Sequence, residues 1–115
     1  AASGSWSPYY CVGMLTADAE SDLLDPASWT KSSVPVFQQS LENEVYGPGG
    51  LSFVPSPDGT EWYMIYHARQ VTTGSPETRN PRIQKIGWDA HGMPDLGIPV
   101  RAGVTLPKPS GTLLK

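Results

Sequence analysis

Two carboxylates separated by a single residue, Glu42 and Glu44, have a spacing that could support acid–base chemistry. In an extended segment, residues i and i+2 point to the same side and lie ~6.6 Å apart. That separation suits a general acid and a general base acting on one bond. No neighbour in the sequence would push their pKa values apart, however, and such pairs in loops are usually solvated. We therefore expect Glu44 to contact ligand hydroxyls at most, and we assign no catalytic residue.

Guanidinium and aromatic side chains are the other groups with binding chemistry. Arg69 and Arg82 flank a loop rich in Thr, Gly and Pro, and a guanidinium offers a planar set of donors to vicinal hydroxyls or a carboxylate. A surface or inter-strand ion pair explains either arginine equally well. Trp6 and Tyr46 lie outside the strand-like runs, so their rings are available to stack on a ligand. The predicted binding residues are Trp6, Glu44, Tyr46, Arg69 and Arg82.

Residues that could ligate a metal are sparse. His67 ends an apolar run over residues 62–69, where a histidine is more often structural than a proton shuttle. Cys11 is the single cysteine, so it forms no internal disulfide, and core packing is its default role. We predict no metal and no cofactor.

The elements that position these side chains are predicted to be short strands. Twelve Gly and 12 Pro among 115 residues exclude a helical bundle. Alternating or apolar runs bounded by turn residues indicate strands instead. The sequence Pro57-Asp58-Gly59 is the sharpest turn signal and should join two antiparallel strands. The expected strands cover residues 9–16, 29–37, 50–54, 62–68, 82–88 and 96–100.

Charge and hydropathy narrow the classes of partner. The net charge is −3 and the sequence has no Lys/Arg cluster, so it indicates no positively charged surface that could bind the phosphate backbone of a nucleic acid. The longest apolar runs, such as residues 11–15, are far shorter than the ~20 residues of a membrane-spanning helix. We therefore expect neither nucleic acid nor a membrane as a partner, and one small folded domain over residues 1–115.

The spacing of the strands matches a propeller blade. Residues 50–100 hold four short strands with a hairpin turn, a longer loop and a second tight turn, which is the content of one antiparallel blade. The preceding residues hold about half a blade more. Residues 101–115 lack alternation and are expected to form a wrapping or frayed tail. The predicted fold class is all-β, an antiparallel β-propeller fragment of about one and a half blades.

Several segments carry a family resemblance in order and spacing. They are residues 24–31, 35–37, 45–53, 56–59, 66–69, 82–86 and 92–99, so the similarity extends from residue 9 to 100. Together they resemble glycoside hydrolase family 43. The similarity is to arabinofuranosidase- and xylosidase-like members that act on arabinan, arabinoxylan and xylan of plant cell walls.

That resemblance implies a five-bladed propeller of which this chain is the carboxyl-terminal part, with residues 9–37 as the outer strands of the blade before the last. Family members use two Asp and one Glu that lie upstream of the matched region, so the chain alone is expected to be inactive. Many members also carry a metal-binding His where this sequence has Gly50, and glycine has no side chain to ligate anything. The alternative is a non-catalytic module, derived from the same fold, that binds carbohydrate or another protein.

The same resemblance implies a location and partners. We expect a secreted protein, either processed or cut from a longer chain, since the sequence begins Ala-Ala-Ser rather than with Met. The expected partners are a plant cell-wall oligosaccharide and the remaining propeller blades. Without those blades, open strand edges near residues 9–16 favour self-association.

Overall fold

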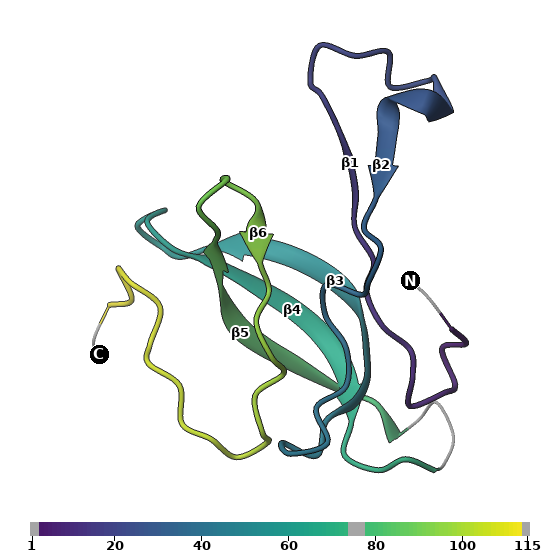
Figure 1. The fold of residues 1–115 in the computed structure, drawn as a ribbon. Helices are drawn as coiled ribbons and strands as arrows, with labels where there is room; N and C mark the ends of the chain where they lie inside the picture. Colours follow the sequence, from purple (N-terminus) through teal and green to yellow (C-terminus); the bar gives the residue numbers. More distant parts are fainter. Residues whose placement is uncertain (1–2, 74–77, 114–115) are drawn as a thin grey trace.

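A four-stranded antiparallel sheet forms the centre of the molecule. The computed structural model describes residues 3–73 and 78–113, and within them it contains no α-helix. Neighbours in the sheet are also neighbours in the sequence (Figure 1). In order across the sheet, the strands are β3 (Tyr46–Pro55), β4 (Trp62–Arg69), β5 (Asn80–Trp88) and β6 (Pro94–Asp95). No helix in the described part of the chain is long and apolar enough to span a bilayer.

A second, two-stranded sheet forms an arm that projects from the larger one (Figure 1). Its strands are β1 (Leu15–Ala17) and β2 (Trp29–Lys31), which pair antiparallel. A short 3-10 helix, η1 (Pro26–Ser28), precedes β2. The Asp25 carboxylate caps this helix by accepting a hydrogen bond from the backbone N–H of Ala27 at 2.9 Å, and Pro26 supplies the fixed φ that suits a helix start.

The turn predicted at Pro57-Asp58-Gly59 joins β3 and β4 as an antiparallel hairpin. The Ser56 N–H donates to the Glu61 carbonyl at 2.8 Å and closes the turn. Gly59 has a φ of 72°, the left-handed conformation that glycine adopts without steric cost. This hairpin fixes the register of the two strands that hold most of the candidate site.

Several strand boundaries differ from the sequence-based expectation, and the strand expected over residues 29–37 already ends at Lys31. Strand β3 begins at Tyr46 rather than residue 50, and it runs through two register shifts associated with Gly47 and Gly50, both at positive φ. The last strand covers Pro94–Asp95 rather than residues 96–100, since Gly97 with a φ of 68° turns the chain away. Between residues 9 and 16, a single bridge from Val12 to Phe37 and the start of β1 replace a continuous strand.

The apolar core lies on one face of the large sheet. On β4, the side chains of Met64, Tyr66 and Ala68 point to this face because side chains alternate along a strand. Phe37 and Val45, from the segment before β3, cover them, and the Phe37 ring meets the Tyr66 ring edge-on at a centroid distance of 5.0 Å. The core therefore joins the amino-terminal half of the chain to the sheet.

The carboxyl-terminal segment is attached to the hairpin turn by two carboxylates. Ser110 donates its hydroxyl to Asp58 and its backbone N–H to Glu61 at 3.0 Å, while the Lys85 ammonium contacts Glu61 at 2.6 Å. The hydrogen bond from Ser110, with others from Ser56 and Thr60, holds the pKa of Asp58 far below its usual range. The hydrogen bond from Lys85, helped by Ser110 and Tyr63, lowers the pKa of Glu61 to about 2.

This attachment should weaken in acid. Both carboxylates have a lower pKa in the folded chain than in the unfolded chain, where Asp and Glu titrate near about 3.9 and 4.3. Their stabilisation is therefore complete above about pH 5 and is lost as pH falls toward about 2. We expect the melting temperature of Ser110→Ala to fall less than that of the wild type between pH 5 and 2.5.

Thermal unfolding at several pH values measures this difference. Thr112→Ala serves as the control because its hydroxyl donates to the Pro109 carbonyl and not to a carboxylate. An acid-induced drop in melting temperature that is the same in Ser110→Ala and the wild type would contradict the proposed attachment.

Candidate functional site

The candidate site lies at the end of the sheet where β3 begins and β4 ends. The register places Tyr46 opposite Arg69, and Gly49 opposite His67. His67 and Arg69 are two residues apart on β4, so both side chains point to the face opposite the core. The amino-terminal segment reaches this end of the sheet, where the Gly47 N–H donates to the Pro8 carbonyl at 2.9 Å.

Arg69 anchors that amino-terminal segment. Its side chain is 1% exposed, and Nη2 donates to the Trp6 carbonyl at 2.9 Å. Nη1 is also buried but has no hydrogen-bond partner among the residues described. The Trp6 side chain itself is 72% exposed. A fixed guanidinium with an unused donor thus binds the backbone of a residue whose aromatic side chain is exposed, and these two groups have the chemistry to bind a ligand with hydroxyls and an apolar face.

His67 occupies space that two glycines provide. Its ring stacks on that of Tyr10, with centroids 6.0 Å apart and planes inclined by 8°. A Cβ at Gly50, whose φ is 63°, would lie 2.7 Å from His67 Cδ2, and a Cβ at Gly49 would lie 2.0 Å from Tyr10 Cε1. Any larger residue at either position would displace one of the two rings.

The His67 imidazole is electrically neutral at neutral pH. Burial lowers its pKa, and the positive charge of Arg79 lowers it further. Its Nδ1 atom is buried and has no partner within residues 3–73 and 78–113. A neutral imidazole carries one N–H donor and one acceptor nitrogen, so it can exchange hydrogen bonds with a hydroxyl group. The position of His67 at the end of an apolar run predicted a structural role, and Arg79 was not among the predicted site residues; its basic side chain just before β5 was the available signal.

The residues present do not fit the metal ion that the family resemblance implies at the position of Gly50. Glycine offers no ligand there, and the space that a side chain would fill is taken by His67. In the described ranges, no three His, Cys, Asp or Glu side chains form a group that could hold a metal. The groups that the described residues bring together here are hydrogen-bond donors and aromatic rings.

Three of the five predicted binding residues meet at this site. Tyr46 pairs with Arg69 across the strands, and Arg69 binds the backbone of Trp6. Glu44 lies at the surface, where its carboxylate contacts the Arg101 guanidinium at 2.6 Å. The backbone carbonyl of Glu42, rather than its carboxylate, binds the same arginine. The two glutamates thus form no acid–base pair.

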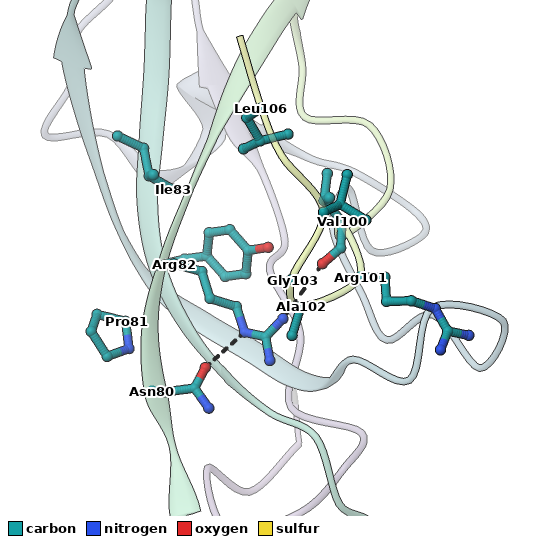
Figure 2. A pocket seen from close by; sticks show the side chains of 11 residues that line it. Asn80, Pro81, Arg82, Ile83, Val100, Arg101, Ala102, Gly103 and Leu106 are labelled. Carbon is teal, nitrogen blue, oxygen red and sulfur yellow. Dashed lines mark hydrogen bonds between the residues drawn. The ribbon is translucent and has the colours of Figure 1, made fainter. Parts of the chain in front are cut away.

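Arg82 lies on the other face of the sheet. It stands opposite Tyr66 on β4, whose side chain points into the core. Its Nε donates to the Asn80 side-chain oxygen at 3.0 Å and its Nη1 to the Val100 carbonyl at 3.4 Å (Figure 2). The sheet therefore separates Arg82 from Arg69, and the two cannot contact one sugar ring together.

Comparison with known proteins identifies the family. The model of glycosyl hydrolases family 43 matches residues 1–94. The chain belongs to this family. It is 50% identical over 101 residues to the "Extracellular exo-alpha-(1->5)-L-arabinofuranosidase" of Streptomyces avermitilis, a match that covers 84% of this chain and 21% of that protein. It is 43% identical over 99 residues to "Alpha-L-arabinofuranosidase B" of Pyricularia oryzae, covering 82% and 20%.

Solved family 43 structures confirm the expected fold class. The alpha-L-arabinofuranosidase from Lactobacillus brevis superposes with a TM-score of 0.75 and 39% identity, over 81% of this chain and 30% of that one. A thermostable family-43 glycoside hydrolase gives a TM-score of 0.74 and 27% identity, over 96% and 33%. This family 43 chain is all-β, an antiparallel fragment of the propeller, and spans about a fifth of the length of these curated relatives.

Proposed function

We propose that this chain is the carboxyl-terminal part of a secreted glycoside hydrolase that acts on arabinose- or xylose-containing plant polysaccharides. Two relatives are named arabinofuranosidases, and one of them is named extracellular, which supports both the substrate class and secretion. The observation that carries the proposal is the buried Arg69 guanidinium, which has one unused donor and binds the backbone carbonyl of Trp6, a residue whose side chain is exposed.

The site has the chemistry to bind a sugar. The apolar C–H face of a sugar ring matches the face of an indole, and sugar hydroxyls match the donors of Arg69 and the neutral imidazole of His67. Each of these two buried side chains has a nitrogen that needs a partner, since an unsatisfied buried group costs about 1–3 kcal/mol. A bound sugar would supply those partners.

The described residues bring no pair of carboxyl groups together at this site that could cleave a glycosidic bond. Inverting hydrolysis requires two carboxyl groups about 6.5–9.5 Å apart on opposite faces of the sugar. Glu44, the predicted carboxylate nearest in sequence to this end of β3, is paired with Arg101 at the surface. We therefore propose that the chain contributes scaffold and sugar contacts, and that hydrolysis depends on carboxylates of the missing blades.

Two measurements on the isolated chain test this proposal. Aryl arabinofuranosides and xylosides should not be hydrolysed, whereas arabino- or xylo-oligosaccharides should bind saturably in calorimetric titration. Trp6→Ala should weaken binding about two- to tenfold, the range expected for one aromatic contact. Trp29→Ala, a matched change on the distant β1–β2 arm, should leave binding unchanged.

The results separate the possible roles. Robust turnover by the chain alone would overturn the assignment of catalysis to other blades. If Trp6→Ala and Trp29→Ala changed the affinity for the oligosaccharide equally, Trp6 would not be a sugar-binding residue. Binding without a catalytic half encoded upstream of Ala1 would favour the second role, a non-catalytic carbohydrate-binding module, for which the unpaired donors of Arg69 and His67 are equally suitable.

A further inference from the structure

A cavity lies on the core-facing side of the sheet, away from Arg69. It has a volume of about 250 Å³ and lies between the first residues of β5 and residues 100–106 of the carboxyl-terminal segment (Figure 2). Apolar side chains of Val104 and Leu106 line part of it, while Tyr66, Arg82 and Arg101 provide polar groups. The cavity is smaller than the roughly 300–1,000 Å³ of drug-sized ligand sites, so it suits a molecule of monosaccharide size.

Arg82 is held in one orientation in the wall of this cavity. Two of its three nitrogens are fixed, Nε by the Asn80 side chain and Nη1 by the Val100 carbonyl. The third, Nη2, is buried and has no partner in the part of the chain that the structure describes. The guanidinium therefore presents a preorganised donor whose hydrogen bond is not satisfied by the described residues.

The charge of the cavity is positive. Two arginines line it and, among the described residues, no Asp or Glu does. Arg101 is neutralised by Glu44, but Arg82 donates to two neutral oxygens, one of the Asn80 side chain and one of the Val100 backbone, and no described carboxylate forms an ion pair with it. Tyr66 adds a hydroxyl that donates to Gln84 at 2.8 Å and that burial keeps protonated by raising its pKa.

We propose that this cavity binds the carboxylate of a small organic acid, with Arg82 as the cationic partner. A carboxylate supplies acceptor oxygens in the plane of a guanidinium and neutralises its charge, which a neutral sugar cannot do. The apolar side chains contact the body of the acid. The acid can be a uronic acid unit of a polysaccharide or a free organic acid, and the site does not depend on sugar binding at Arg69.

Calorimetric titration with glucuronate, glucose and isobutyrate tests the proposal. Glucuronate should bind saturably and glucose should not, because they differ in the carboxylate. If isobutyrate binds with the same affinity as glucuronate, the site is assigned to free organic acids. If isobutyrate binds more weakly than glucuronate, the site is assigned to uronic acid units. Arg82→Gln should weaken glucuronate binding at least tenfold, and Lys31→Gln, the same charge change on exposed β2, should leave it unchanged.

A second variant keeps the test independent of folding. Val104→Trp fills the cavity from the exposed carboxyl-terminal segment and should abolish glucuronate binding while the melting temperature stays near that of the wild type. Failure of both acids to bind, equal binding of glucose, or wild-type affinity in Arg82→Gln would overturn the proposal. None of these outcomes changes the effect expected of Trp6→Ala on oligosaccharide binding. The proposal for the cavity at Arg82 and the proposal for the site at Arg69 are therefore tested independently.

Discussion

Replacing Phe37 by alanine is expected to lower the free energy of unfolding by about 3–5 kcal/mol. The side chain is 1% exposed and packs against Tyr66, and its backbone carbonyl accepts a hydrogen bond from the Val12 N–H at 2.8 Å. Removing the ring leaves a cavity at the point where the amino-terminal half meets the sheet. Domains of this size have a free energy of unfolding of about 5–15 kcal/mol in total, so this loss removes a large part of the stability of the fold.

Urea denaturation at 25 °C measures this loss. Leu24→Ala, at a position that is 93% exposed on the β1–β2 arm, provides the control and should change the stability by less than about 0.5 kcal/mol. A similar loss in both variants would mean that Phe37 does not pack as the structure places it.

The second large effect is expected in assembly. On the core-facing side of the sheet, beyond the part covered by Phe37, the side chains of Phe53, Trp62 and Trp88 line an entirely apolar hollow of about 250 Å³ together with Pro94. Phe53 and Pro94 also border a neighbouring hollow that reaches Val12 and Leu51. An exposed apolar surface of this kind favours association, either with the remaining blades of the propeller or, in the isolated chain, with a second copy.

Sedimentation equilibrium at micromolar concentration should therefore detect dimers or larger species. Trp88→Lys, at a side chain that is 55% exposed, should shift the chain to monomer. Trp6→Lys makes the same change on the opposite face and should not. A wild-type monomer with a cooperative melt would show that this apolar surface does not drive association.

The described residues near the two ends of the chain do not cover this surface. Residues 3–8 lie at the Arg69 end of the sheet, and Ser110 binds the hairpin turn through Asp58 and Glu61. Neither segment contributes a residue to the hollow around Trp88 within the described chain. Folding back of the tails, which their Pro and Gly content allows, is thus not what the structure shows at this surface.

Local sequence signals predicted the hairpin but not the bulged strand. The turn at Pro57-Asp58-Gly59 and the alternating run of β4 depend on neighbouring residues alone, so their chemistry is visible in the sequence. Strand β3 contains Pro48 and two glycines at positive φ, which normally end a strand. It continues here because its partner β4 supplies hydrogen bonds on either side of the register shifts, which no local pattern records.

The site was predictable in its residue types but not in its geometry. Guanidinium and indole groups identified Arg69 and Trp6, yet their contact spans 63 residues of sequence. Which face Arg82 occupies depends on the pairing of β4 with β5, which the sequence of the connecting loop does not determine. The role of Gly50 in making room for His67 likewise depends on cross-strand packing.

The long span of the Arg69–Trp6 contact also bears on the order of folding. Strands β3, β4 and β5 pair with their sequence neighbours, so the closing of short loops is enough to form them. The bond from Arg69 to Trp6 closes a loop of 63 residues and is entropically slower to form. We therefore expect the sheet to assemble first and the amino-terminal segment to attach afterwards, so that the aromatic side of the candidate site is completed late.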